Sequence, residues 1–366
     1  MMVEVLFYPL FRLSGRPKLL PMSLVISLTY RCNSRCSTCR VWEREARELS
    51  AEEWEEFFHR FAPARLYYLT FSGGEPFLRE DIARIVTTAA RVLKPALITI
   101  PTNGILTRRI VEGVKEMLES MPGGTKLGIN LSLDGIGEEH DRIRNVPGNW
   151  NKAMETYQAL RAISHPALIL SIHTVISRFN VERMGEIARA LLALNPDSYI
   201  TEVAEEREEL HTVGLPITPS HSEYRMAIEE VLKVLGSRKF TGLPRLTQAF
   251  RQEYYRLTEK ILREKRQVIP CYAGWASGHI APDGDVWTCC TRAQPVGNLR
   301  ETGYDLRPIW FGEEIEKLRR SIKAKECYCP MANASYVNML FHLPTILRLL
   351  KCNLLPCSAG KRTLYP

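Results

Sequence analysis

The sequence predicts an α/β fold. Six parallel β-strands and their connecting helices form a partial (β/α)6 TIM-like barrel, and a small C-terminal α+β domain follows it. Two observations lead to this class. From about residue 23, short runs rich in β-branched residues alternate with longer amphipathic runs, which is typical of repeated βα units. Beyond a charged helical stretch, the chain changes to short strands, turns and closely spaced cysteines from residue 271.

The strands are expected at six apolar or β-branched runs: Leu24–Tyr30, Tyr67–Ser72, Ala96–Thr102, Leu127–Leu133, Leu168–Ile176 and Ser198–Val203. Helices are expected between them, at Ala51–Phe61 after the N-cap residue Ser50, Arg79–Leu93, Arg108–Ser120, Asn149–Ile163 and Val181–Leu194. Parallel strands need crossover helices, which cover both faces of the sheet. Six such units therefore favour a curved, partly closed barrel over an open hairpin sheet.

The chain divides into five expected segments. They are an N-terminal extension (1–22), the barrel (23–218), a helical bridge (219–267), the small C-terminal domain (268–335) and an amphipathic C-terminal tail (336–366). The bridge is highly charged, with apolar residues at helical spacing. The two ends of the chain are apolar and basic, so we expect either docking against the barrel or a peripheral contact with a membrane surface.

The composition limits the partners and the compartment. The 366 residues, 45% hydrophobic and 25% charged, suffice for a full core and one accessory domain. The net charge is +8, but no basic stripe with interleaved aromatic residues occurs, so no nucleic-acid partner is expected. No run has the length and apolarity of a membrane span, and the N-terminus lacks the pattern of a signal peptide. With ten cysteines in short groups, a cytoplasmic metal protein is expected.

Three cysteines follow the first strand in the pattern Cys32-x3-Cys36-x2-Cys39. Three thiolates at this spacing can hold three irons of a [4Fe–4S] cluster and leave the fourth iron open. The alternative is a zinc site. Zinc normally takes four ligands, with cysteines in C-x2-C pairs, so three isolated cysteines match a zinc site poorly. The motif Gly73-Gly74-Glu75-Pro76 ends the second strand. In βα barrels the chemistry lies at the carboxyl ends of the strands, where both motifs fall.

These two motifs resemble those of the radical S-adenosylmethionine (SAM) enzymes, and the resemblance extends from about residue 22 to residue 329. It implies that the open iron binds SAM, that SAM is cleaved reductively, and that the resulting 5′-deoxyadenosyl radical removes a hydrogen atom from an unactivated carbon. A flavodoxin or ferredoxin is the implied electron donor. The family usually has an aromatic residue before the third cysteine, where this chain has Thr38. Trp42 or Tyr30 could supply the adenine contact instead.

The resemblance also implies a set of SAM-binding residues at the strand ends. Gly73, Gly74 and Glu75, followed by Pro76, would meet the methionine amino group, and Ser132 with Arg144 would hold its carboxylate. Asn103 would contact the ribose or sulfonium region, or form only a turn with Gly104. In the loop after the fourth strand, Asp134 would help to shape the site. His140 and Asp141 are either part of that site or helix-capping residues.

A second group of cysteines lies beyond the bridge. Pro282-Asp283-Gly284-Asp285 reads as a turn between two short strands, which would bring Cys271 back to Cys289. Cys327 and Cys329 would complete a four-thiolate pocket. The stretch from Cys271 through Gly284 to Cys289 resembles the opening of the SPASM and twitch domains, which implies one auxiliary [4Fe–4S] cluster, with two clusters or a zinc site as alternatives.

Three further cysteines have open roles. Cys290 could exchange with Cys289 as a ligand or remain a free thiol. Cys352 and Cys357 are either ordinary buried cysteines or members of a cluster.

Three residues are candidates for direct catalytic roles. His173 and Glu202 lie on the last two strands at positions that could point into the barrel, where each is either a substrate contact or a satisfied structural group. Cys290 could return a hydrogen atom to a substrate radical. The fate of that radical would decide the product: oxidation, epimerisation or bond formation.

The substrate class is left open by the residues. Many enzymes of the resembling architecture modify ribosomally made peptides and carry an N-terminal peptide-recognition domain, for which residues 1–22 leave little room. We therefore expect a small-molecule, sugar or lipid-linked substrate, with a peptide maturase as the alternative. The alternative of another class is a non-catalytic zinc-binding scaffold.

Overall fold

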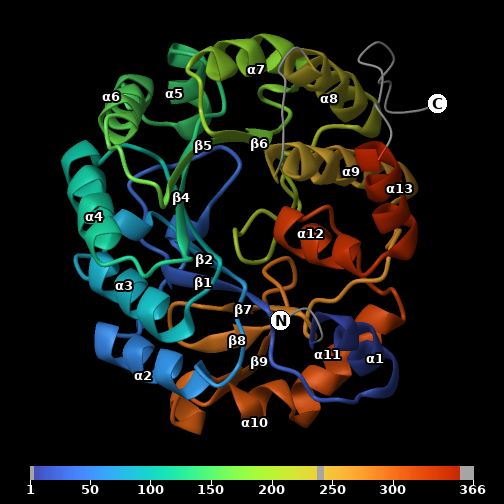
Figure 1. Ribbon diagram of the computed structural model, residues 1–366. Coiled ribbons are helices and arrows are strands. Elements are labelled where there is room, and N and C mark those ends of the chain that lie inside the picture. Colours follow the sequence, from blue (N-terminus) through green and yellow to red (C-terminus); the bar gives the residue numbers. More distant parts are fainter. Residues whose placement is uncertain (1–3, 237–242, 355–366) are drawn as a thin grey trace.

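A nine-stranded sheet forms the centre of the computed structural model, which describes residues 4–236 and 243–354. The strand order is β6-β5-β4-β3-β2-β1-β7-β8-β9. Figure 1 shows helices on the outside of the curved sheet formed by β1 to β6. The partial barrel that the sequence predicts is therefore present.

The first six strands pair in parallel and lie within two residues of their predicted bounds. They are β1 (Ser23–Thr29), β2 (Tyr68–Gly73), β3 (Leu97–Thr102), β4 (Lys126–Ser132), β5 (Leu168–Ile176) and β6 (Ser198–Val203). Their side chains alternate between two environments, because successive residues of a strand point to opposite faces. One set packs beneath the helices, for example Leu69, Phe71, Ile98 and Ile100. The other set lines a cavity inside the barrel and is small and polar, for example Thr70, Ser72, Thr99, Asn130 and Ser171.

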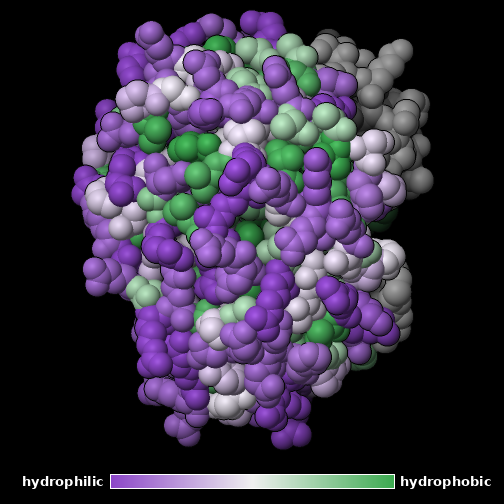
Figure 2. All heavy atoms as spheres, turned by 90° about the vertical axis from the view of Figure 1, so that its left-hand side faces the viewer, coloured by the Kyte–Doolittle hydropathy of each residue, from purple (hydrophilic) through white to green (hydrophobic). Residues whose placement is uncertain are grey.

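The crossover helices cover the outer face of the sheet. They are α2 (Ala51–Phe61), α3 (Ile82–Leu93), α4 (Thr107–Glu119), α5 (Glu138–Arg144), α6 (Asn149–Arg161) and α7 (Met184–Ala193), with 3-10 turns η2 (Val41–Glu43), η3 (Pro76–Leu78) and η4 (Val181–Arg183). Ser50 caps α2 in a capping box with Glu53, as predicted. Figure 2 shows that the face on the α3, α4 and α6 side is mostly hydrophilic, with hydrophobic atoms gathered near its middle.

The predicted start of the second helix at Arg79 is wrong, since α3 begins at Ile82. Arg79 is buried in the preceding turn, where its guanidinium donates to Asp81 (2.6 Å) and to the carbonyls of Leu28 (3.1 Å) and Leu49 (2.9 Å). These bonds tie the start of α3 to the end of β1. The helical pattern extends through Arg79, but tertiary hydrogen bonds decide its conformation.

The predicted C-terminal hairpin is present, and its strands extend the barrel sheet. Strand β7 (Ser277–Ile280) pairs in parallel with β1, and β8 (Asp285–Trp287) pairs antiparallel with β7 and with β9 (Pro295–Asn298). Gly278 allows this approach, because a Cβ there would lie 2.8 Å from the Trp310 ring. The edge of β1 is thereby covered, and the hairpin is held beside the barrel.

The remaining helices enclose the C-terminal half. They are α8 (His221–Gly236), α9 (Leu243–Glu264), η5 (Leu299–Thr302), α10 (Leu306–Trp310), α11 (Glu313–Lys323), α12 (Ala332–Leu340) and α13 (Leu343–Leu354). The helical bridge is thus α8 and α9.

At the N-terminus, η1 (Glu4–Phe7) and α1 (Tyr8–Ser14) dock against the C-terminal half, since the Tyr8 ring lies 5.7 Å from that of Phe341. Leucines of α1 and α13 remain exposed, so a peripheral membrane contact stays a prediction. Within the described ranges, no helix is long and apolar enough to cross a membrane.

Candidate active site

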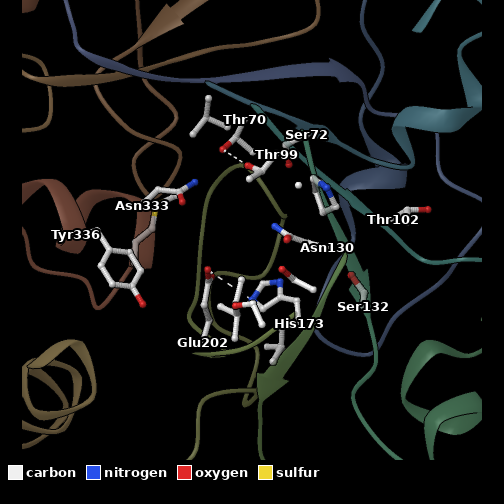
Figure 3. A pocket seen from close by; sticks show the side chains of 18 of the residues that line it. Thr70, Ser72, Thr99, Thr102, Asn130, Ser132, His173, Glu202, Asn333 and Tyr336 are labelled. Carbon is white, nitrogen blue, oxygen red and sulfur yellow. Dashed lines mark hydrogen bonds and ion pairs between the residues drawn. The ribbon is translucent and has the colours of Figure 1, made fainter. Parts of the chain in front are cut away.

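A cavity of about 950 Å³ lies inside the barrel and extends toward the C-terminal half. Its wall contains the inward side chains of the six parallel strands, the loop of the first cysteine triad, the segment after β6, and residues of α9 and α12. Figure 3 shows strand residues such as Thr99, Asn130 and His173 facing this space, with Asn333 and Tyr336 opposite them. The motifs at the strand ends therefore share one chamber with the C-terminal half.

The thiols of Cys32, Cys36 and Cys39 all line this cavity. Each accepts one N–H donor at sulfur: from Ser34 N (3.4 Å), from Arg144 Nη1 (3.7 Å) and from Val41 N (3.5 Å), respectively. Burial raises the pKa of all three thiols above the ordinary range. A buried thiol group with N–H donors directed at sulfur suits metal-bound thiolates, so the triad fits a [4Fe–4S] cluster.

The cysteine loop is anchored by the short helix α5. Ser37 N donates to the carbonyl of Ile143 (2.8 Å), and Arg35 N donates to that of Arg144 (3.2 Å). The loop is thus held by both β1 and α5.

The backbone packing requires glycine at both glycine positions of the Gly73–Pro76 motif, which the sequence did not reveal. A Cβ on Gly73 would lie 2.1 Å from Thr29 O, and one on Gly74 would lie 2.1 Å from Arg31 O. Gly73 also has φ +114°, a conformation that other residues rarely adopt. Gly74 N donates to Thr29 O (2.7 Å), and Glu75 N donates to Arg31 O (2.9 Å). The glycines let β2 bond to the chain that leads into Cys32.

Glu75 is fully buried, and its carboxylate is engaged within the protein. It accepts from Thr102 Oγ1 (2.9 Å), Asn103 N (2.8 Å) and Phe77 N (3.2 Å). Burial raises the pKa of Glu75 to about 7. The carboxylate therefore joins the ends of β2 and β3, and the predicted contact of Glu75 with the amino group of SAM stays a prediction.

Arg144 is held toward the cysteine loop by a buried ion pair with Asp134 at 2.8 Å. Asp134 Oδ1 also accepts from Val175 N (2.9 Å), which fixes the carboxylate against β5. The Nε atom of Arg144 is buried and has no hydrogen-bond partner. With Ser132 also lining the cavity, this free N–H fits the predicted grip on a ligand carboxylate.

Asn103 forms the predicted turn and also bonds to the cysteine loop. Its Oδ1 accepts from Ile105 N (3.0 Å), while its Nδ2 donates to Asn33 Oδ1 (2.6 Å) in the cysteine loop. Thr38 also lines the cavity. The rings of the two aromatic substitutes do not: Trp42 is covered by Arg35 at 4.5 Å, and Tyr30 by Arg44 at 4.9 Å. The structure therefore gives no support to an adenine contact from either ring.

His140 and Asp141 have structural roles, as the capping alternative predicted. His140 Nδ1 accepts from Asp134 N (3.1 Å), and its Nε2 contacts Asn149 Oδ1 (3.1 Å). Asp141 accepts from Gly148 N and Trp150 N, each at 2.7 Å, at the start of α6. Both residues shape the loop and the helices after β4.

His173 and Glu202 face the cavity from neighbouring strands, as predicted. His173 Nε2 lies 3.5 Å from Glu202 Oε1, a contact drawn in Figure 3. At this distance His173 Nε2 forms no hydrogen bond, and both side chains are partly exposed. Their catalytic roles stay a prediction.

A charged group that the sequence analysis did not identify continues from Glu202 along the segment after β6. Arg207 Nη2 lies 2.9 Å from Glu205 Oε1 and 3.9 Å from Glu202 Oε2. Glu209 follows in the same segment and is buried. The rule that barrel chemistry follows the strand ends could have found them. The sequence analysis does not identify Asn333 and Tyr336 of α12 either, because they lie beside or within the segment expected to be a tail (336–366).

The second group of cysteines forms a separate small cavity of about 40 Å³, lined by Cys271, Cys289, Cys327 and Cys329. Burial raises the pKa values of Cys271, Cys289 and Cys329, and the nearby thiolates of the same group raise them further. Backbone N–H groups donate to these sulfurs. Four converging thiols with N–H donors fit an auxiliary iron–sulfur cluster.

Cys290 points away from this thiol pocket. Its Sγ lies in the wall of the main cavity, 2.9 Å from Met331 Sδ and 3.9 Å from Arg207 Nη1. Cys289, rather than Cys290, therefore joins the thiol pocket. The side chains of Cys352 and Cys357 lie outside the described residues.

Family comparisons cover both cysteine groups. The family model described as the Radical SAM superfamily matches residues 26–191, and the model described as an iron–sulfur cluster-binding domain, SPASM, matches residues 271–330. Each match contains one of the two cysteine groups.

Two relatives are similar in sequence to this chain over most of its length. The PqqA peptide cyclase of Granulibacter bethesdensis is 28% identical over 80% of this chain and 74% of its own length. The AdoMet-dependent heme synthase of Methanosarcina barkeri is 26% identical over 82% of this chain and 85% of its own length.

Two solved structures share the fold. Streptococcus suis SuiB bound to the precursor peptide SuiA has a TM-score of 0.62 at 17% identity, covering 91% of this chain and 76% of its own. Native anSMEcpe with bound AdoMet and Cp18Cys peptide has a TM-score of 0.61 at 15% identity, covering 92% of this chain and 100% of its own.

Proposed function

Because this chain belongs to the radical SAM superfamily and carries a C-terminal SPASM domain, we propose that it modifies a peptide by removing a hydrogen atom from one of its carbons. The predicted superfamily, the fold class and the cofactor types, [4Fe–4S] clusters and SAM, are confirmed by these matches. The number of auxiliary clusters and a flavodoxin or ferredoxin donor remain proposals.

The choice of a peptide reverses the preference drawn from the sequence for a small molecule. A relative that is named as a peptide cyclase, and two structural neighbours whose descriptions include bound peptides, support the peptide alternative. The observation that carries the proposal is the cavity of about 950 Å³, which extends from the first cysteine triad to α12 and can enclose a side chain with flanking backbone. The heme synthase relative supports a small-molecule substrate as the second candidate.

When bound, the first cluster and SAM supply a 5′-deoxyadenosyl radical that takes one hydrogen atom from the substrate. Arg144, through its free Nε–H, orients the ligand carboxylate, and the polar side chains of β3 to β5 position the substrate carbon. The Glu202–His173 pair accepts a proton from the substrate radical. An auxiliary cluster held by Cys271, Cys289, Cys327 and Cys329 would accept the remaining electron, so the peptide would lose two hydrogen atoms in all, either as a new double bond or as a new internal bond.

Epimerisation is the competing outcome, because Cys290 faces the same cavity. Its thiol, when it holds no metal, would return a hydrogen atom to the substrate radical and leave the peptide mass unchanged. The thiyl radical left behind would be reduced by one electron from the electron donor and one proton. Turnover in D2O distinguishes the two reactions. Deuterium incorporation that disappears in Cys290→Ala supports epimerisation, whereas loss of two hydrogen atoms supports oxidation.

The test of the proposed function uses anaerobically reconstituted protein with SAM, dithionite and synthetic peptides encoded beside its gene. We expect 5′-deoxyadenosine and a peptide whose mass falls by two hydrogens, and neither product with Cys36→Ala. SAM cleavage stimulated by a tetrapyrrole or a sugar, but by none of the peptides, would overturn the peptide proposal. Bound zinc without any SAM cleavage would favour a non-catalytic scaffold.

A further inference from the structure

Three buried side chains with metal-binding atoms converge in the wall of the main cavity: Glu209, His279 and Cys290. Their carboxylate oxygen, ring nitrogen and sulfur all lie within 4.8 Å of one another. We propose that they form a binding site for a divalent metal ion of the zinc type. This site is additional to the two cysteine groups that fit iron–sulfur clusters.

The fold brings these residues together from three separate segments. Glu209 belongs to the segment after β6, His279 to β7, and Cys290 to the turn after β8. Ser27 of β1 links two of them, since its Oγ donates to Glu209 Oε1 (3.1 Å) and lies 3.0 Å from His279 Nε2. The His279 ring stacks on Trp287 with a centroid distance of 4.9 Å. The donor atoms are therefore fixed by neighbours before any ion binds, which lowers the cost of binding.

The two ring nitrogens of His279 have different surroundings. Its Nε2 faces Ser27 and Glu209, but its Nδ1 is buried without any hydrogen-bond partner. A buried polar atom left unpaired is costly, so native structures rarely keep one. Glu209 Oε1 lies 3.3 Å from Nε2, so an ion shared with this carboxylate would bind Nε2, with the ring proton on Nδ1.

The local charge also favours a cation. Within residues 4–236 and 243–354, the cation beside Glu202, Glu205 and Glu209 is Arg207, whose guanidinium is already paired with Glu205 at 2.9 Å. Arg44 is more distant and lies over the Trp287 ring, 5.7 Å from its centroid. Buried carboxylates are costly unless positive charge accompanies them. A divalent ion would supply that charge at Glu209.

The set of donors indicates the class of ion. A thiolate and an imidazole with one carboxylate suit zinc and similar borderline ions, whereas Mg²⁺ and Ca²⁺ take oxygen ligands. The Met331 thioether beside Cys290 adds a soft neighbour. Three protein ligands leave a coordination position open, as in catalytic zinc sites. Because all three residues line the main cavity, that position would face the substrate chamber.

The experiment uses the whole protein with both cluster sites filled under anaerobic conditions, so that the cysteine groups are not available to zinc. After equilibration with zinc and desalting, metals are counted by mass spectrometry, and the zinc is examined by X-ray absorption at its K edge. We expect one zinc per chain in addition to about eight irons, with both sulfur and nitrogen or oxygen as neighbours. Cys290→Ala and His279→Gln should each weaken zinc binding by more than ~100-fold, beyond the loss caused by removing an outer-shell partner.

The matched control is His221→Gln. His221 also contacts a glutamate, Glu259, but that pair is not part of the cavity wall. This variant should keep its zinc, and the iron content should stay unchanged in all three variants. Wild-type protein with full iron but no retained zinc would overturn the proposal. So would Cys290→Ala and His279→Gln variants that retain as much zinc as the wild type. Either result leaves the peptide reaction untouched, because that reaction is read from SAM cleavage and peptide mass.

Discussion

Replacing Gly74 with alanine should specifically disturb the first cysteine loop. The added Cβ would lie 2.1 Å from Arg31 O, 2.7 Å from Arg31 C and 2.8 Å from Tyr30 O. An unstrained C···O contact needs about 3.3 Å, so one of the two chains must move by about 1.2 Å. All three atoms are backbone atoms, directly before Cys32, so no side-chain rotation relieves the clash.

The energetic cost follows from the hydrogen bonds that this movement breaks. Gly74 N to Thr29 O (2.7 Å) and Glu75 N to Arg31 O (2.9 Å) join β2 to the end of β1. Each buried bond left unmade costs about 1–3 kcal/mol, so the variant should lose about 2–6 kcal/mol. Because Cys32 follows immediately, the first cluster should be lost before the auxiliary one. Iron per chain should fall by roughly half, and SAM cleavage should fall with it.

The assay is iron content, cluster spectroscopy and thermal unfolding of the reconstituted protein, with Gly113→Ala as the matched control. A Cβ on Gly113 in α4 would meet only the Phe77 ring, at ordinary distances of 3.6 Å to Cε1 and 3.8 Å to Cδ1. That variant should keep all its iron and gain up to about 1 kcal/mol from its better helix propensity. If Gly74→Ala kept full iron and SAM cleavage, with a Tm within about one degree of the wild type, the steric reasoning would be refuted.

Three further changes test other parts of the cavity. Glu202→Gln keeps the side-chain size but removes the proton acceptor, so the ratio of modified peptide to 5′-deoxyadenosine should fall by at least ~100-fold, while the exposed Glu208→Gln leaves it unchanged. Asp134→Asn leaves the buried Arg144 charge unpaired and should cost about 3–5 kcal/mol in urea unfolding; a loss below about 1 kcal/mol would contradict a buried pair. Burial lowers the pKa of His140 to about 4, so this neutral histidine stabilises the fold above pH 6.5, and the contribution is lost as the pH falls from 6.5 toward 4. The wild type should lose about 2 kcal/mol more between pH 7 and pH 5 than His140→Gln, and equal losses would show that His140 does not cause the dependence.

The sequence predicted those parts of the site that depend on strand position. Each inward position at a strand end, such as Ser132, His173 and Glu202, follows from period-two alternation and from the rule that barrel sites lie at the carboxyl ends. Contacts between distant segments were not accessible in this way. Nothing local shows that Glu75 accepts from the end of β3, or that Gly73 and Gly74 avoid clashes with β1.

The C-terminal half shows the same division. The turn at Gly284 and the hairpin follow from local sequence, but the pairing of β7 with the edge of β1 depends on Gly278 fitting against Trp310. Tyr336 and Asn333 were missed because a helix that lines a cavity on one side and packs on the other has no distinctive pattern. Their positions come from the packing of α12 against α9 and α13.

The adjacent pair Cys289 and Cys290 shows why ligand assignment is harder than motif detection. The two residues lie where the chain enters the turn after β8, and there one thiol enters the second cysteine pocket while the other enters the main cavity. A shift of one residue would exchange their surroundings without changing the sequence. The backbone bonds of Glu208 N to Thr291 O (3.2 Å) and of Glu209 N to Cys290 O (3.4 Å) fix this choice. Those same bonds hold Glu209 beside Cys290, so the contact that directs Cys289 to the second pocket also assembles the proposed zinc site.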